Sequence, residues 1–225
     1  MREIVLDTET TGLDPQAGHR VVEVGCIELF NTVATGKTFH AYFNPEMAMP
    51  TGAQDVHGLS DEFLSDKPLF AERMEEFLEF IGDAQLVIHN AQFDIGFLNA
   101  ELERAGKPKL LNAYVDTVSI ARRRFPGQRA SLDALCERFG IDNSSRTKHG
   151  ALLDSELLAE VYLELSGGRQ RDLGLAPELA AAAAVATVVA SLPVRLPRPH
   201  AASVAELAAH TEFLKKLKDA LWLAS

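Results

Sequence analysis

The chain has 225 residues, of which 47% are hydrophobic and 24% are charged, and its formal net charge at pH 7 is −10. This is the composition of an ordinary globular protein, and the length allows one sizeable domain with an appendage. The negative charge argues against a general nucleic-acid coat protein, although an acidic domain can bind nucleic acid where metal ions neutralise its site. The charge is uneven, because residues 1–166 hold 15 Lys/Arg against 27 Asp/Glu, whereas residues 167–225 hold 7 against 5.

Three features bear on the cellular compartment. Arg2 and Glu3 lead straight into a predicted strand, so no secretory signal segment is expected. The longest apolar run, 179–194, is mostly alanine and is too short and weak to span a bilayer. Cys26 and Cys136 lie in apolar strand-like and helix-like patterns, which is typical of buried thiols in a reducing compartment. We therefore expect a cytoplasmic protein that makes no membrane contact.

The predicted elements begin with a buried strand at 4–6, where three apolar residues precede two carboxylates and a glycine turn. Two apolar-rich segments, 21–30 and 37–44, are predicted to be strands that form an antiparallel meander with the first. Residues 47–58 are punctuated by Pro and Gly and are predicted to be a loop.

Helices and short strands alternate in the next part of the chain. Helices are predicted at 68–81, 94–106, up to Arg124, 131–140 and 149–165, and strands at 86–89 and 114–117. This order predicts a mixed five-stranded sheet flanked by helices, an α/β or α+β layered domain that ends at Ser166.

The composition changes after this domain. Residues 176–190 are rich in Ala and Val, and 192–199 carry three prolines, which favours an extended or irregular linker over 167–200. Ser203 and Glu206 form a capping-box pattern, which predicts a helix within 201–225.

Four acidic residues are the candidate metal ligands. Asp7 and Glu9 follow the first strand two residues apart, so their side chains share a face, although a strand that ends in solvent would also explain them. Asp94 and Asp154 lie near predicted helix starts, which converge with strand ends at one edge of an α/β sheet. Four carboxylates in one place need about two divalent cations, and oxygen ligands favour Mg²⁺ or Mn²⁺. His149, five residues before Asp154, can accept a proton from water near neutral pH.

The set Asp7-x-Glu9, His89-Asn90-x-x-Phe93-Asp94 and His149-x-x-x-x-Asp154 resembles the DEDDh family of 3′→5′ exonucleases, over residues 2–165. The resemblance implies an RNase H-like fold and two-metal hydrolysis that releases 5′-mononucleotides. In this family pattern Asp7, Glu9 and Asp154 hold the metal that carries the attacking water. Asp7 also bridges to the second metal, Asp94 supports that metal through water, and His149 is the general base.

The resemblance also implies contacts to the 3′ end of the substrate strand. The turn after Glu9 is expected to meet the terminal sugar and to wedge the terminal base; it comprises Thr10, Thr11, Gly12 and Leu13. Phe93 either shapes the nucleotide pocket or belongs to the core, and His57 is either a site-edge residue or a loop cap. His89 is expected to be structural, and Asp116 either caps a helix or is a fifth acid near the pocket. The arginines of 122–129 either touch phosphates or form a solvated face.

The segment after residue 166 distinguishes between the functions that an exonuclease of this family can have. Gln170, Leu173 and Leu175 resemble the hexapeptide (170–175) that binds a sliding clamp, and 193–222 resemble the segment with which proofreading members of the family bind the catalytic subunit of a replicative DNA polymerase. We therefore predict a proofreading 3′→5′ exodeoxyribonuclease that acts on single-stranded or frayed DNA 3′ ends and has these two partners, with a small stabilising subunit as a third. The alternatives are a free-standing DNA or RNA trimming exonuclease whose tail binds nothing, and a non-catalytic clamp–polymerase adaptor. For the C-terminal helix, the alternative is that it packs on its own domain.

Overall fold

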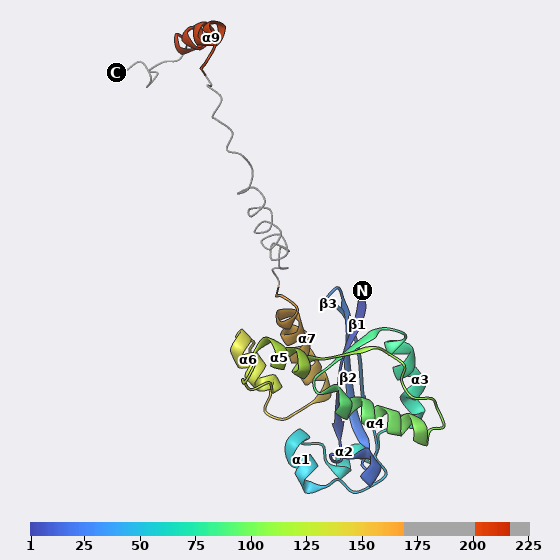
Figure 1. Cartoon of the computed structure of the whole chain (residues 1–225). Helices are drawn as coiled ribbons and strands as arrows, with labels where there is room; N and C mark the ends of the chain where they lie inside the picture. The colour runs from blue at the N-terminus through green and yellow to red at the C-terminus, as the bar shows by residue number, and fades with distance from the viewer. Residues whose placement is uncertain (169–200, 217–225) are drawn as a thin grey trace, which may run out of the picture. The chain divides into compact units, whose positions relative to one another are not determined.

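The computed structural model describes residues 1–168 and 201–216 (Figure 1). Its sheet has the strand order β3-β2-β1-β4-β5, with β1 (Arg2–Thr10) in the centre. The strand β1 pairs antiparallel with β2 (Val21–Phe30), which pairs antiparallel with β3 (Val33–Tyr42). On its other side β1 pairs parallel with β4 (Gln85–Ile88), and β4 with β5 (Tyr114–Asp116). The predicted mixed five-stranded sheet and its opening meander are confirmed.

Helices cover both faces of this sheet, as Figure 1 shows. Alternate residues of β1 point to opposite faces, so Ile4 and Leu6 pack with α3 (Phe70–Ile81) and α4 (Ala91–Arg104). Val5 packs on the other face, against the layer formed by α5 (Thr117–Arg124), α6 (Leu132–Phe139) and α7 (Ala151–Leu165). Ile4, Val5 and Leu6 are fully buried, and each such side chain stabilises the fold by about 1.5–3 kcal/mol.

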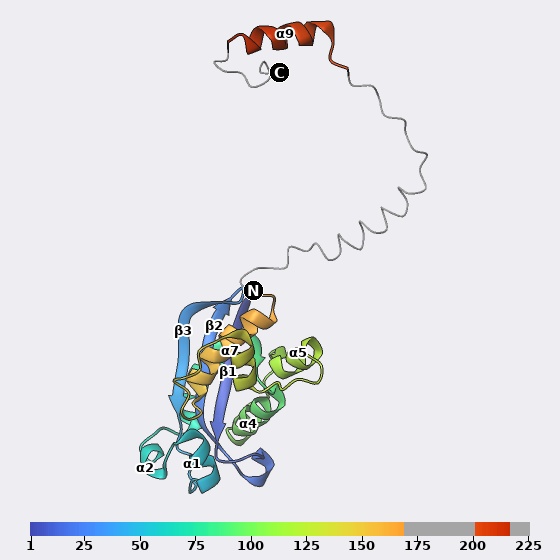
Figure 2. The ribbon, with the colours of Figure 1, turned by 90° about the vertical axis from the view of Figure 1, so that its left-hand side faces the viewer.

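The last helix of the domain is tied to the first strand. The hydroxyl of Tyr162 on α7 donates to the Glu3 carboxylate at 2.7 Å, across 159 residues of sequence. The strand β1 runs from the N-terminus toward the end of the domain that carries α1 (Thr51–His57) and α2 (Asp61–Leu64), as Figure 2 shows. That end of the domain therefore receives Asp7 and Glu9.

Several predicted boundaries were wrong. The predicted loop 47–58 contains α1, because Pro50 and Gly58 mark the two ends of a helix, with Gly58 in the left-handed region at φ 78°. The short α2 and the 3-10 helix η1 (Pro15–Ala17) were not predicted. The strand β3 starts at Val33 and not at 37. The helix α4 begins at Ala91, before Asp94, and α7 begins at Ala151, so His149 precedes the helix.

Residues 201–216 contain the predicted helix, α9 (Val204–Leu214). Its capping box is confirmed, because the Ser203 backbone N–H donates to the Glu206 carboxylate at 2.8 Å and the Glu206 N–H donates to the Ser203 hydroxyl. The proposed clamp-binding residues Gln170, Leu173 and Leu175 lie outside the described residues. Within 1–168 and 201–216, no helix is long and apolar enough to cross a membrane, and both cysteines are buried free thiols.

Candidate active site

The close approach of α7 to β2 places Asp154, on α7, beside Asp7 and Glu9, on β1. Gly25 on β2 pairs with Asp7 of β1, and a Cβ at Gly25 would lie 2.3 Å from the backbone of Ala151 and Leu152. The first turn of α7 can therefore reach the sheet only because this strand position has no side chain. The Ser155 hydroxyl fixes the contact by donating to the Gly25 carbonyl at 3.0 Å.

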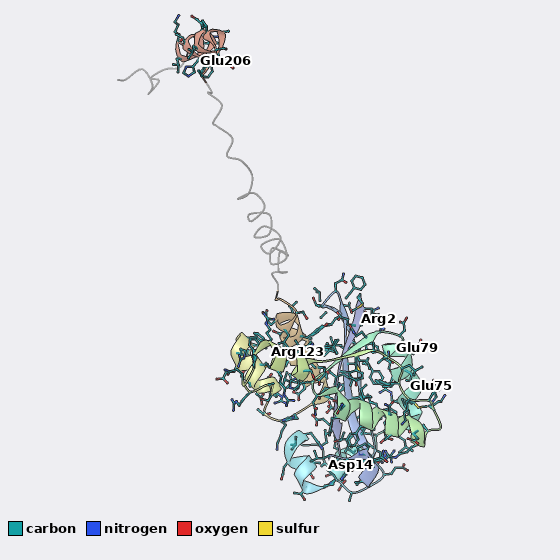
Figure 3. The ribbon with its side chains drawn as sticks, in the orientation of Figure 1. Arg2, Asp14, Glu75, Glu79, Arg123 and Glu206 are labelled. Atoms are coloured by element: carbon teal, nitrogen blue, oxygen red, sulfur yellow. The ribbon has the colours of Figure 1, made fainter. Side chains whose placement is uncertain are left out.

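The four acidic residues line one cavity of about 1000 Å³, together with His149: Asp7, Glu9, Asp94 and Asp154. Asp94 and Asp154 lie in the first turns of α4 and α7, where the helix dipole favours a negative charge. Asp94 comes from the opposite face of the sheet, and the hydroxyl of Thr8 donates to it at 2.7 Å. Asp14, from the turn after β1, also lines the cavity, and Figure 3 shows it at the end of the domain opposite Arg2.

Burial and mutual repulsion make these carboxylates costly to ionise. The pKa of Asp7 is raised well above 3.8, first by burial and then by the charges of Asp94 and Glu9. Burial, followed by the charge of Glu23, raises the pKa of Glu9 to about 8. Burial also raises the pKa of Asp94 to about 7, against the opposing effect of the Thr8 hydrogen bond. Cations bound among these oxygens would favour the ionised forms.

The donor atoms suit a divalent cation. One ligand atom each from Glu9, His149 and Asp154 lie within 4.8 Å of one another, and Asp7 and Asp94 supply further carboxylate oxygens to the same cavity. A site dominated by oxygen donors is the environment that Mg²⁺ and Mn²⁺ prefer. The residues present therefore fit the divalent metal that the sequence predicted.

His149 lies in the loop before α7 and its side chain is 47% exposed. The pKa of its imidazole is lowered, first by burial and then by the charge of Arg146. An Arg146 guanidinium nitrogen lies 3.0 Å from its Nδ1, and the same guanidinium donates to both oxygens of Asp154. Sequence analysis did not single out Arg146, because its bond to Asp154 depends on the path of the loop.

A second residue that sequence reasoning missed is Glu23. It is 3% exposed, lies opposite Glu9 in the β1–β2 pairing and contacts the His40 ring at 2.7 Å. A carboxylate inside an otherwise apolar strand is uncommon, and that was the available signal.

The turn after Glu9 lines the cavity. All four of its predicted substrate residues belong to the lining: Thr10, Thr11, Gly12 and Leu13. The two threonine hydroxyls hold the turn itself, since Thr10 donates to the Gly12 carbonyl at 2.6 Å and Thr11 accepts from the Arg20 N–H at 2.9 Å. Leu13 is 85% exposed, which suits an apolar wedge at the rim of the cavity.

Three further side chains line the cavity and also make structural contacts. Phe93 lines the cavity and also packs on Phe97, with ring centroids 4.9 Å apart. His57 ends α1, lines the cavity and accepts from the Leu59 N–H through Nδ1, and its buried Nε2 has no hydrogen-bond partner among the described residues. His89 lines the cavity and contacts the Thr117 hydroxyl at 2.9 Å.

Asp116 has the structural role that the sequence favoured. It is the N-cap of α5 and accepts from the Val118 N–H at 3.0 Å and from the Asn90 N–H at 3.1 Å. These bonds connect the ends of β4 and β5, so Asp116 supports the turn that carries Asn90.

The family model described as "Exonuclease" matches residues 4–162, which cover the whole cavity. The chain belongs to this exonuclease family. The exonuclease is 59% identical over 174 residues to the DNA polymerase III subunit epsilon of Rickettsia prowazekii (strain Madrid E), a match that covers 76% of each chain. It is 51% identical over 177 residues to the DNA polymerase III subunit epsilon of Escherichia coli (strain K12), with 75% of this chain and 72% of that one covered.

Solved structures confirm the fold of the exonuclease. The nuclease domain of 3′hExo, a DEDDh family member bound to rAMP, aligns with a TM-score of 0.64 at 19% identity and covers 76% of this chain and 94% of that one. The E. coli ExoI–ssDNA complex aligns with a TM-score of 0.67 at 18% identity, over 86% and 45% of the two chains. The exonuclease therefore has the RNase H-like fold, and it is a metal-dependent 3′→5′ exonuclease of the DEDDh family.

Proposed function

We propose that this exonuclease is the proofreading subunit of a replicative DNA polymerase and removes mismatched nucleotides from DNA 3′ ends. The observation that supports the chemistry is the meeting of Asp7, Glu9, Asp94 and Asp154 with His149 around one cavity. The observation that supports the replicative role is the identity of 51–59% to chains named DNA polymerase III subunit epsilon.

We assign two divalent cations, Mg²⁺ or Mn²⁺, to this cavity. When bound, they would lower the pKa of a water molecule and neutralise charge on the attacking and leaving oxygens. Asp7, Glu9 and Asp154 would hold the first ion, and Asp7 and Asp94 the second. His149 would accept the proton of the attacking water, and its exposed position at the cavity mouth leaves it free to pass that proton to solvent.

Selection of mismatched ends would follow from the single-stranded character of the substrate. A mismatched terminus melts more readily than a paired one, so the cost of separating the terminal nucleotide is smaller. Leu13 would stack on or wedge the terminal base, and the backbone of the turn at Thr10–Gly12 would face the terminal sugar. His57 and Phe93 would complete the wall of the nucleotide pocket.

The domain organisation follows the same proposal, with the nuclease at 1–166, a linker at 167–200 and a polymerase-binding helix within 201–225. The described part of α9 supports this role, because Val204, Leu207 and Phe213 are large apolar residues that are 55–86% exposed. Its partner would be the catalytic (alpha) subunit of DNA polymerase III. The residues Gln170, Leu173 and Leu175 would bind the sliding clamp, a small subunit would stabilise the nuclease, and the complex would act in the cytoplasm.

Hydrolysis of a 5′-labelled single-stranded oligonucleotide tests the chemistry. The wild-type chain should release mononucleotides from the 3′ end with Mg²⁺ and lose activity in EDTA. Asp7→Ala and Asp154→Ala should remove activity while the circular dichroism spectrum stays native. Asp83→Ala changes an exposed carboxylate outside the cavity and should act as wild type. Persistent hydrolysis by the two site variants would refute the assigned site.

Co-purification with the polymerase catalytic subunit tests the replicative role. The full chain should bind, a chain ending at residue 166 should not, and Leu207→Ala with Phe213→Ala should weaken binding without loss of nuclease activity. If the truncated chain binds as well as the full chain, α9 is not the docking element. A preference for RNA over DNA of the same sequence would instead favour a free-standing trimming exonuclease.

A further inference from the structure

One side chain holds together the residues on which the proposed chemistry depends. The guanidinium of Arg146 donates through Nε to Oδ1 of Asp154 and through Nη2 to Oδ2 at 2.7 Å. Its Nη1 donates to Asp133 at 2.9 Å, and Nη2 also donates to Nδ1 of His149 at 3.0 Å. The side chains of Arg146 and Asp154 are only 8% and 4% exposed, so the bond between them is largely shielded from water, whereas Asp133 and His149 are partly exposed.

This arrangement determines the state of His149. Arginine has no acceptor, so the contact with Nδ1 requires that Nδ1 is unprotonated and accepts the bond. A neutral imidazole has one acceptor nitrogen, and here Arg146 uses it. His149 therefore has no lone pair left with which to take a proton from water while this contact persists.

The same guanidinium is bound to Asp154, one of the proposed metal ligands. Both carboxylate oxygens of Asp154 accept from Arg146, and the ligand atoms of Glu9, His149 and Asp154 lie within 4.8 Å of one another. A divalent cation among these atoms would lie close to a unit positive charge, and the two would repel strongly in a site this buried. Asp133 lines the cavity with its side chain 58% exposed, so it remains as a partner for a guanidinium that leaves Asp154.

We propose that Arg146 is a tethered cation that occupies Asp154 and the acceptor nitrogen of His149 until a divalent metal ion replaces it. Replacement moves the guanidinium onto Asp133 and frees His149 to act as the base. Metal loading and base activation are then one event, so an enzyme without its metal has no active base. This inference rests on the proposed roles of Asp154 and His149.

Metal binding by the full chain without DNA tests the competition. In a titration with Mg²⁺ followed by calorimetry, Arg146→Gln should bind about tenfold more tightly than wild type, as expected if the resting pair is about 90% populated. Arg146→Lys keeps the charge without the two-pronged contact and should lie between them. Arg73→Gln is the matched control, because Arg73 makes a similar two-pronged bond to Glu76 on α3, outside the cavity. Its Mg²⁺ affinity should equal that of wild type.

A second measurement needs no variant. In ¹⁵N NMR spectra of the metal-free wild type, the Nε–H of Arg146 should be protected from exchange, and saturating Mg²⁺ should shift it and remove the protection. A signal that stays unchanged at saturation, or an Arg146→Gln affinity equal to or weaker than that of wild type, overturns the competition. Asp154→Asn separates the two proposals: if it binds Mg²⁺ as tightly as wild type, the site assignment itself fails. If it binds weakly and Arg146→Gln is unchanged, only the role of Arg146 fails.

Discussion

Substitution of Gly25 by alanine should damage the active site from a distance. The added methyl carbon would lie 2.3 Å from the backbone carbonyl carbon of Ala151 and from the N atom of Leu152, and 2.4 Å from the Ala151 oxygen. Since ordinary contacts start near 3.4 Å, the first turn of α7 must retreat by about 1.1 Å. That turn carries Asp154, so the carboxylate moves with it.

Two effects of different size follow from this shift. Overpacking of this kind costs about 1–3 kcal/mol of unfolding free energy, which lowers Tm by roughly 2–12 °C for a chain of this length. Misplacement of a catalytic group by about 1 Å costs on the order of 100-fold in rate. Gly25→Ala should therefore keep its fold at 25 °C and lose most of its activity.

Thermal melting and the hydrolysis rate of a single-stranded oligonucleotide measure the two effects. Gly96→Ala on α4 is the control, since a Cβ there meets no atom within 4 Å and alanine favours a helix. Adding Ala151→Gly to Gly25→Ala should not restore activity, because the clash is with backbone atoms. If Gly25→Ala melts lower but hydrolyses DNA at the wild-type rate, the close approach serves stability alone and does not position Asp154.

Three further predictions concern pH, the wedge and a buried ion pair. The folded pKa values of Glu9 (about 8) and Asp94 (about 7) exceed their ordinary 4.5 and 3.8, so the folded chain binds more protons than the unfolded chain. In EDTA, Tm should therefore fall as pH rises from about 4 to 8, and Glu9→Gln should flatten this dependence; a Tm that rises over this range contradicts the shifts. Leu13→Ala should slow removal of paired 3′ termini more than of single-stranded ones and change the unfolding free energy by less than about 0.5 kcal/mol; equal slowing on both substrates would exclude a wedge. Glu101→Ala should cost about 3–5 kcal/mol in denaturant unfolding, because the 2% exposed carboxylate pairs with Arg20 through two bonds of 2.8 and 2.9 Å; a loss below 1 kcal/mol would show that the pair is dispensable.

Sequence analysis predicted most of the elements that leave a periodic or local pattern of residues. The strands, the main helices and the acidic residues all leave periodic or short-range patterns, and Asp7, Glu9, Asp94 and Asp154 do line one cavity. Short elements were harder, because α1 lies between Pro50 and Gly58, and the same residues punctuate loops.

The contacts that sequence could not supply are those made across the fold. The two-pronged bond of Arg146 to Asp154 depends on how the loop 140–149 closes, and nothing local specifies that path. The hydrogen bonds of the turn after Glu9 are a further case: the Thr10 hydroxyl donates to the Gly12 carbonyl and the Thr11 hydroxyl accepts from the Arg20 N–H, because a polar side chain in a turn can satisfy backbone groups. These contacts depend on how distant parts of the chain pack together, and local sequence patterns contain little information about that packing.

The bond between Tyr162 and Glu3 has a consequence for the newly made chain. Among the elements of the nuclease domain the ribosome releases β1 first and α7 last, so Asp7 and Glu9 emerge about 145 residues before Asp154. Until α7 docks, the face of the sheet that carries Val5 is uncovered and the acidic cluster lacks its fourth member. With the site as proposed, chains that end before α7 lack Asp154, and we expect nuclease activity to begin only when synthesis of the domain is complete.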